Sequence, residues 1–331
     1  MGALPVTGLL DFTSHATDAI VARDGARRVR RVACRARWTL AGHVAKPRAP
    51  SPSDRFSTQG ELLVANDFGP KRLGTTVLVT GRIVSEPGEF ARAVHARIEI
   101  APLAESASQA QRPRRFEAVA YPPRVWVKTD AGFVAQAIGP FEPVAATFAE
   151  AFGGPSCDAN PIGKGALEPG ASAEGQPLPR VEAPESPLDE PFGRPPPRAL
   201  GLVAPGWTPR KEFAGTYDER WRRTRAPELP EDASPRLFDP GSFVLEPKLR
   251  GGERIDLVNF AEPGPRSIVV PRVLVRFVVD RRTVRPEIDE VHVDLDAGTI
   301  ELLLRADLPW DGSIPLAPIF VRELGLVERA S

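Results

Sequence analysis

The prolines of this chain are concentrated in its middle. Of 37 prolines among 331 residues, 18 lie between residues 151 and 250, against 12 in residues 1–150 and 7 in residues 251–331. Proline fixes φ and lacks a backbone donor, so a dense series of prolines is incompatible with long helices and central strands. The sequence therefore predicts regular structure on both sides of a loop-dominated middle segment.

Both flanks carry patterns typical of β-strands. Residues 30–40, RRVACRARWTL, alternate apolar side chains with Arg31, Arg35 and Arg37. This alternation predicts a half-buried strand whose arginines face solvent. Other β-branched or alternating runs predict strands over 75–85, 90–100, 116–127 and 267–280, the last interrupted at Pro271, and a hairpin over 290–295 and 299–305.

Helix signals are few. Residues 144–152, VAATFAEAF, follow a proline and end at two glycines, which predicts two helical turns. Residues 316–326 predict a short helix after Pro318, and residues 218–225 predict one turn capped by Asp218. The sequence favours a mainly β fold with antiparallel, sandwich-like sheets, few short helices and a long proline-rich middle segment.

The expected organisation has three parts. A β-rich region over residues 1–150 is followed by the proline-rich segment over 151–265 and a second β-rich region over 266–331 that packs with the first. A loop segment of this length is unusual in a compact domain and is commonly functional or ordered by a partner.

The charge balance argues against electrostatic capture of large anions as the main function. Lys and Arg number 43, as do Asp and Glu, whereas binding to nucleic acid or anionic membranes depends on positive charge. The cysteines, Cys34 and Cys157, are expected to be inert thiols in a reducing compartment, although a disulfide between them stays open. No signal-peptide pattern or membrane-spanning run is present. We expect a cytoplasmic protein with neither nucleic-acid nor membrane partners.

A glycine-rich run over residues 151–165 contains Lys164 and invites comparison with a phosphate-binding loop. Its spacing does not match GxxxxGK[ST], and no strand leads directly into a helix here. A packed turn with Phe152 directed inward is the favoured interpretation.

Residues 211–221, KEFAGTYDERW, form the second cluster. Tyr217 and Trp221 are four residues apart and share a helical face, which predicts that they anchor the loop to the β-scaffold. Asp218 and Glu219 point to different helical faces and make a poor acid/base pair. We expect this cluster and the glycine-rich run to be partly buried structural clasps, with partner contacts elsewhere.

Two further clusters are weak candidates for binding. The arginines of residues 27–37 fit a solvated strand face better than a phosphate site. His292, Asp294 and Asp296 alternate along a strand, but one His with two Asp is a weak metal signal. No GxSxG, HExxH or CxxC motif occurs. We expect no catalytic, cofactor-binding or metal-binding residues.

Several segments together resemble the bacterial family catalogued as domain of unknown function 2169. The resemblance covers roughly residues 25–310 and includes AEAFGGPSCDANPIGKG, LVAPGW, GTYDERW and ELPEDASPRLFDP in the family's order. The residues that fit the family's motifs, and are expected to be structural or partner-binding, are Phe152, Gly153, Gly154, Asn160, Pro161, Gly163, Gly165, Gly215, Thr216, Tyr217, Asp218 and Trp221.

The resemblance implies a role in type VI secretion. Members of the family look like cytoplasmic adaptors or chaperones that load a toxic effector onto the valine–glycine-repeat spike protein, and they are not known as enzymes. By this resemblance we expect a non-enzymatic adaptor in the bacterial cytoplasm or at the secretion apparatus. Two alternatives stay open: a hydrolase-type effector enzyme, and a structural accessory of the spike or baseplate.

The chain also departs from the family pattern. Tyr121, Pro122, Pro123 and Arg124 stand where relatives have Gly-Asp-Arg before a Trp, and the residues after Asp232 differ as well. Partner recognition is therefore expected on exposed edges and loops, including the segment after Asp232.

Overall fold

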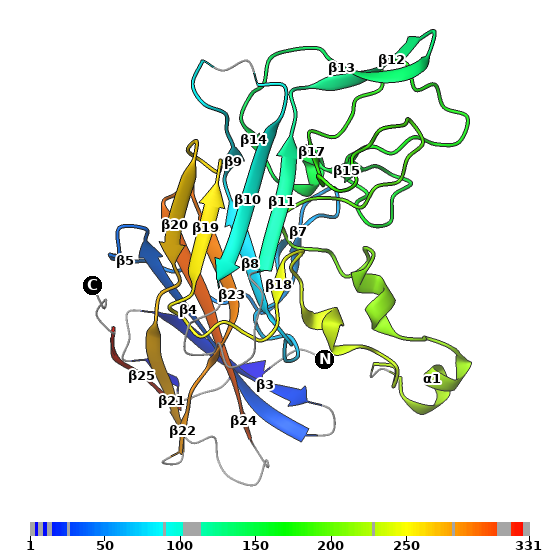
Figure 1. Cartoon of the computed structure of the whole chain (residues 1–331). Helices are drawn as coiled ribbons and strands as arrows, with labels where there is room; N and C mark the ends of the chain where they lie inside the picture. Colours follow the sequence, from blue (N-terminus) through cyan, green and yellow to red (C-terminus); the bar gives the residue numbers. More distant parts are fainter. Residues whose placement is uncertain are drawn as a thin grey trace.

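Two β-sheets packed face to face form the centre of the molecule (Figure 1). The computed structural model describes residues 4–5, 9–11, 15–24, 27–88, 91–101, 114–226, 229–279, 282–309 and 319–326.

The larger sheet has eight strands within these ranges, in the order β1-β3-β4-β24-β23-β8-β18 with β5 beside β4. Their bounds are β1 Leu4–Pro5, β3 Ala16–Asp24, β4 Arg27–Thr39, β5 Val44–Ala45, β8 Thr75–Thr80, β18 Val244–Leu245, β23 Glu287–Asp294 and β24 Thr299–Pro309. Neighbouring strands are antiparallel except β8 and β23, which are parallel. The predicted strand at residues 30–40 and the predicted hairpin are confirmed.

The smaller sheet is antiparallel and has the order β17-β11-β10-β19-β20. Its strands are β17 Val181–Glu182, β11 Arg114–Ala120, β10 Val94–Ala101, β19 Arg254–Val258 and β20 Pro265–Val269. Strand β19 falls within residues 151–265, so the end of the proline-rich segment contributes directly to the sandwich.

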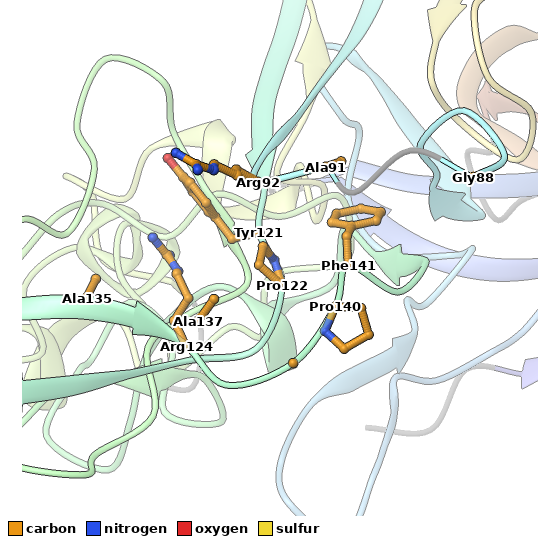
Figure 2. A pocket seen from close by; sticks show the side chains of 11 residues that line it. Gly88, Ala91, Arg92, Tyr121, Pro122, Arg124, Ala135, Ala137, Pro140 and Phe141 are labelled. Atoms are coloured by element: carbon orange, nitrogen blue, oxygen red, sulfur yellow. The ribbon is translucent and has the colours of Figure 1, made fainter.

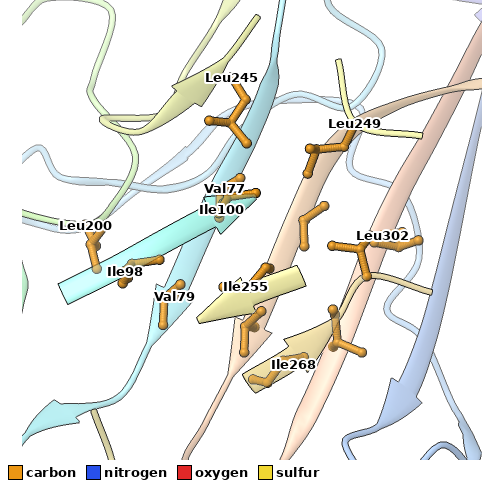
Figure 3. Close-up of a cluster of buried hydrophobic side chains, with 14 of the residues drawn as sticks. Val77, Val79, Ile98, Ile100, Leu200, Leu245, Leu249, Ile255, Ile268 and Leu302 are labelled. Carbon is orange, nitrogen blue, oxygen red and sulfur yellow. The ribbon is translucent and has the colours of Figure 1, made fainter. Parts of the chain in front are cut away.

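Side chains from both sheets fill the space between them (Figure 3). Val77 and Leu302 of the larger sheet meet Ile98 and Ile255 of the smaller one, and each of the four is completely buried. Burial of an aliphatic side chain of this size stabilises the folded state by about 1.5–3 kcal/mol. The sandwich-like arrangement predicted from the alternating flanks is confirmed.

The remaining strands form smaller sheets. One has the order β2-β25-β21-β22, and four are two-stranded pairs, counted within the described ranges. Their bounds are β2 Leu9–Asp11, β25 Ile319–Leu326, β21 Val273–Val279 and β22 Arg282–Val284, then β6 Arg55–Phe56 with β7 Leu62–Val64, β9 Arg82–Ile83 with β14 Val144–Ala145, β12 Arg124–Thr129 with β13 Gly132–Ala137, and β15 Phe152–Gly153 with β16 Lys164–Gly165.

The helical segments are short: the 3₁₀ turns η2 Phe148–Glu150, η3 Arg210–Ala214 and η4 Pro235–Phe238, and the helix α1 Glu219–Thr224. The turn predicted at residues 218–225 is confirmed as α1. None of the described helices is long and apolar enough to cross a membrane.

Two helix predictions are wrong. Residues 144–152 form β14, η2 and β15, because Val144 pairs with Ile83 and Phe152 pairs with Lys164. Of residues 316–326, those from Ile319 onward form β25 between β2 and β21, and the others lie outside the described residues. Periodicity alone does not separate a strand from a helix in apolar runs this short, so the available sheet partner decides.

Candidate functional site

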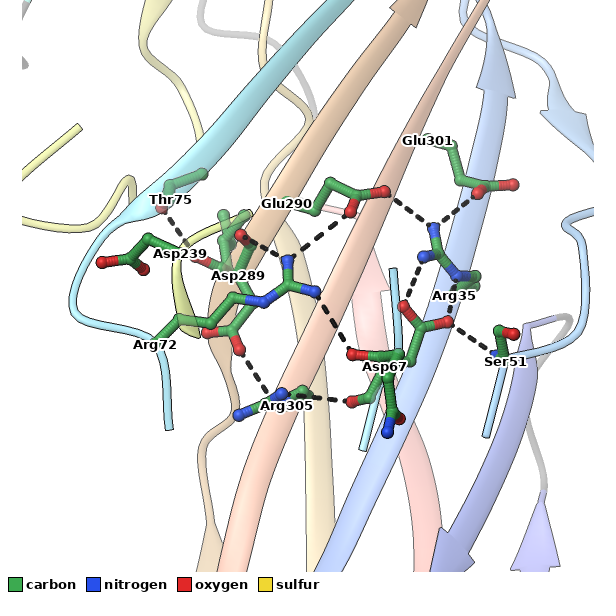
Figure 4. A network of polar contacts seen from close by, with 12 residues as sticks. Arg35, Ser51, Asp67, Arg72, Thr75, Asp239, Asp289, Glu290, Glu301 and Arg305 are labelled. Atoms are coloured by element: carbon green, nitrogen blue, oxygen red, sulfur yellow. Dashed lines mark hydrogen bonds and ion pairs between the residues drawn. The ribbon is translucent and has the colours of Figure 1, made fainter. Parts of the chain in front are cut away.

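The outer face of the larger sheet carries a buried network of charged side chains (Figure 4). Arg35 of β4 lies at its centre and makes two contacts with Asp67, Nε to Oδ2 at 2.8 Å and Nη2 to Oδ1 at 2.6 Å. Its Nη1 donates to Glu301 at 2.8 Å and to Glu290 at 3.2 Å. The three carboxylates come from a loop and two strands, so one guanidinium ties together three segments.

Neighbouring arginines hold residues 66–70 against the same sheet face. Arg31 donates to the Phe68 and Gly69 carbonyls at 3.1 and 2.6 Å, and Arg305 donates to the Asp67 and Pro70 carbonyls at 3.2 and 2.9 Å. These contacts satisfy backbone acceptors that would otherwise be buried without partners.

The prediction that the arginines of β4 face solvent is wrong for Arg31 and Arg35, and Arg37 is half-buried. The side chains of Arg31 and Arg35 are each 1% exposed, and Arg30 is also buried. Alternation along β4 identifies the polar face correctly, but it carries no information about a loop that covers that face with carboxylates and carbonyls.

A β-bulge in β23 supplies two consecutive carboxylates to the network. The pairing of β23 with β24 shifts register between Ile288 and Glu290, while Ile288 and Val291 both lie in the sandwich core. Because of the extra residue, the consecutive side chains of Asp289 and Glu290 both contribute carboxylates to the network on the outer face of the sheet. Asp289 Oδ2 lies 2.8 Å from Nε of Arg305.

The network holds Glu290 and Arg35 in their charged forms. Burial raises the pKa of Glu290, but the charges of Arg35, Arg72 and Arg48 outweigh it and lower that pKa to about 2. Burial lowers the pKa of Arg35, yet Glu290 and Asp67 raise it above its usual value. The short ion pairs of Arg35 with Asp67, Glu290 and Glu301 indicate a structural role.

The first family motif folds into a compact knot around Asn160, which is completely buried. Its Nδ2 donates to the carbonyls of Phe148 and Phe152 at 2.7 and 2.9 Å. Phe152 is 2% exposed and packs with Trp126 and Leu167, so the prediction that it points inward is confirmed.

The motif glycines are explained by this knot. A Cβ on Gly153 would lie 2.2 Å from the Asn160 carbonyl oxygen, and one on Gly163 would lie 2.3 Å from Asn160 Nδ2. Gly154 and Gly165 have φ values of 148° and 93°, which residues with a side chain rarely adopt. Pro161 is half-buried beside Asn160. The amine of Lys164 pairs with both Glu150 oxygens at 2.9 Å, unlike a phosphate-loop lysine.

The second family motif forms a projecting arm, residues 215–225, that contains α1. In Figure 1, α1 lies apart from both sheets. Gly215 has a φ of 79°, and Thr216 donates its N–H and hydroxyl to Asp232 at 3.0 and 2.7 Å. Asp218 accepts from the Trp221 N–H at 2.7 Å, which confirms the predicted N-cap.

Tyr217 of the arm is exposed and does not belong to the core of the β-scaffold. Tyr217 is 49% exposed and packs edge-to-face on the half-buried Trp221, with ring centroids 4.7 Å apart. The prediction that Tyr217 anchors the arm to the β-scaffold is therefore wrong. The spacing of the two residues correctly predicted that their rings lie together. The rings pack on each other, and neither belongs to the sandwich core.

A pocket of about 650 Å³ lies where the sequence departs from the family pattern (Figure 2). The Arg124 guanidinium lies 3.6 Å from the centroid of the Tyr121 ring and donates to Glu182 at 2.5 Å. Burial and the charge of Glu182 raise the pKa of Tyr121. Pro122 and Phe141 complete much of the apolar lining. Sequence analysis noted this departure but did not predict a pocket.

The weak chemical candidates have structural partners. Glu219 pairs with Arg222 and Arg223 at 2.8 and 2.9 Å. His292 Nε2 lies 2.8 Å from the Thr80 hydroxyl, and Asp294 accepts from the Ala297 N–H at 2.8 Å.

Over the described ranges, no group of three or more His, Cys, Asp or Glu side chains is placed to hold a metal ion. Cys34 is buried and Cys157 is half-buried, and they are not joined by a disulfide.

Comparison with known protein families gives one match for this chain. The bacterial family described as "Uncharacterized protein conserved in bacteria (DUF2169)" matches residues 25–305. The chain belongs to this family. The match covers the Asn160 knot, the arm, the smaller sheet and the larger sheet apart from β1, β3 and the end of β24, in agreement with the resemblance read from the motifs. No match was found among curated proteins or among solved structures.

Proposed function

We propose that this DUF2169 protein is a non-enzymatic adaptor that binds a type VI secretion effector and helps to load it onto the valine–glycine-repeat spike protein. The resemblance of its motifs supplies the secretion context. In this proposal it acts in the bacterial cytoplasm or at the secretion apparatus, and its partners are the effector and the spike.

The observation that best supports a binding role is the exposed arm. Tyr217, which precedes the N-cap Asp218, packs on Trp221 of α1, and the Asp232 contacts with Thr216 fix the base of this turn. Exposed Tyr and Trp are the side chains most often found as binding hot spots. Because the turn is already ordered, little conformational freedom is lost when a partner binds.

The network and the knot support the same role differently. The buried side chains of Arg35 and Asn160 form hydrogen bonds that hold the surrounding loops in place. A scaffold that is fixed in this way presents its arm in one orientation, which favours a specific protein contact.

The test is co-purification from the native cell with tagged wild type and variants. Tyr217→Ala is expected to weaken effector binding about thirtyfold, since hot-spot truncation costs about 2 kcal/mol. Its melting temperature should stay unchanged, because Tyr217 is 49% exposed and lies outside the sandwich core. Phe56→Ala removes an aromatic ring of equal exposure, 49%, outside the arm and is the matched control.

Two outcomes contradict the proposal. If no discrete effector co-purifies with the wild type, the adaptor role is wrong. If Tyr217→Ala retains full effector binding with an intact fold, the arm is not the contact surface. Hydrolysis of a cell-wall or nucleic-acid substrate by the purified protein would instead favour the effector-enzyme alternative.

A further inference from the structure

A second pocket, of about 490 Å³, lies beside the ion network and shares Arg72 with it. Its lining includes five cationic residues and one acidic residue: Lys71, Arg72, Lys248, Arg250 and Arg285, with Glu287. The chain as a whole has a formal net charge of zero, so this is a local excess of positive charge. We refer to it as the basic pocket.

The positive charge of the basic pocket is only partly neutralised. Glu287 is shared by two ammonium groups, Lys71 Nζ at 3.1 Å and Lys248 Nζ at 2.8 Å. Lys248 also pairs with Asp289 at 2.5 Å. Arg250 and Arg285 are exposed, and their guanidinium groups form no ion pair with any residue that the structure describes.

Arg72 forms the inner cationic part of the lining and is weakly held. Its side chain is 2% exposed, and its contacts are long: 3.4 Å to the Asp289 carbonyl, 3.5 Å to Glu290 and 3.5 Å to the Asn66 carbonyl. Figure 4 shows the side chain reaching toward these groups. Contacts at this length leave donor capacity for a stronger acceptor.

Apolar side chains form the rest of the lining. Leu249, Ile288 and Leu304 are buried beneath it, while Leu73 is 42% exposed and Pro247 is also exposed. An apolar centre with a charged rim is the usual anatomy of a protein interface. Phosphate groups of a nucleic acid require cations but no apolar seat.

We propose that the basic pocket binds an acidic segment of a partner protein, with an apolar side chain of that segment against Leu73 and its carboxylates at Arg250 and Arg285. The inference rests on the proposed adaptor function and names the chemistry of one partner segment. Charge complementarity selects an acidic partner, and the apolar lining selects a peptide over a nucleic acid.

Fluorescence anisotropy with a labelled peptide of Glu, Asp and Leu, at low ionic strength, tests this directly. The double variant Arg250→Glu/Arg285→Glu is expected to weaken binding by at least about tenfold, or about 1.4 kcal/mol. Added salt should also weaken binding. Arg92→Glu reverses an exposed charge in the Tyr121 pocket and should leave affinity unchanged.

The variants are designed to keep the fold. Arg250 and Arg285 are exposed, so the melting temperature of the double variant should match that of the wild type. Arg250→Gln/Arg285→Gln removes both charges without reversing them and should give a smaller loss. A peptide with Ser in place of Leu should bind more weakly, because it lacks the apolar side chain.

Any of three results overturns the inference. The first is a labelled peptide that shows no saturable binding to the wild type, and the second is a loss of peptide affinity in Arg92→Glu as large as that in the double variant. The third result is a single-stranded DNA of equal charge that displaces the labelled peptide as well as the unlabelled peptide does. If the peptide fails while an effector still co-purifies with the wild type, only the basic-pocket inference falls. If the peptide binds while no effector co-purifies, only the adaptor proposal falls.

Discussion

Replacing Arg35 by Met should expose how strongly the buried ion network depends on one side chain. The change leaves Asp67 and Glu290, which are 0% and 1% exposed, without their central cation. Removing one partner of a buried ion pair costs about 3–5 kcal/mol, because the remaining charge is uncompensated. We expect a loss of this size in the free energy of unfolding at neutral pH, measured by urea denaturation.

Arg37→Met is the matched control on the same strand. Arg37 is half-buried, and its guanidinium donates to a neutral acceptor, the Thr299 hydroxyl, at 2.9 and 3.2 Å. Its loss should cost only about 1 kcal/mol. If the two variants lose equal stability, the network argument is wrong.

The pH dependence gives a second readout. In the wild type, the lowered pKa of Glu290 contributes stability that is present above its unfolded value of about 4.5 and lost as pH falls toward about 2. Arg35→Met removes the largest of the charges that lower the pKa of Glu290, and protonation of Glu290 then relieves its buried charge. The deficit relative to the wild type should therefore shrink below about pH 5. A deficit that stays constant with pH would refute the reasoning.

Three smaller predictions concern the family motifs. Asn160→Asp should destabilise the protein more than Asn160→Ala, because a carboxylate places an acceptor against the Phe148 and Phe152 carbonyls. Thermal melts at neutral and acidic pH check this: the melting temperature of the Asp variant should rise at acidic pH, where the buried carboxylate takes up a proton. Gly163→Ala should cost about 1–3 kcal/mol, since its Cβ would lie 2.3 Å from Asn160 Nδ2; an unchanged melting temperature would contradict it. Asp218→Ala removes the α1 N-cap and should weaken partner binding without lowering the main melting transition, as compared by pull-down and calorimetry.

The strands were the most predictable part of the fold. Alternation over residues 30–40 and the turn before Thr299 gave β4 and the β23–β24 hairpin, because both signals are local. The apolar run at Ile319–Leu326 gave the wrong element, since its strand partners β2 and β21 come from distant parts of the chain.

The candidate sites were less predictable for the same reason. The burial of Arg35 depends on Asp67 and Glu290, which approach it only through the tertiary fold. Local glycine chemistry correctly indicated a tight knot near Phe152, but it did not reveal that Asn160 is its centre. Sequence also brought Tyr217 and Trp221 together without showing that Tyr217 is exposed.

The order of strands in the larger sheet has a consequence for synthesis on the ribosome. Strand β4 pairs with β24, and β8 pairs with β23, so one edge of each early strand stays unpaired until residues 287–309 have been made. Arg35 and Glu301, which share a hydrogen bond, are separated by 266 residues. Contacts this distant in sequence slow folding, and unpaired strand edges favour aggregation while they wait. Nascent chains that stall before β23 leaves the ribosome would therefore expose apolar strands. Complete translation is thus a condition for solubility.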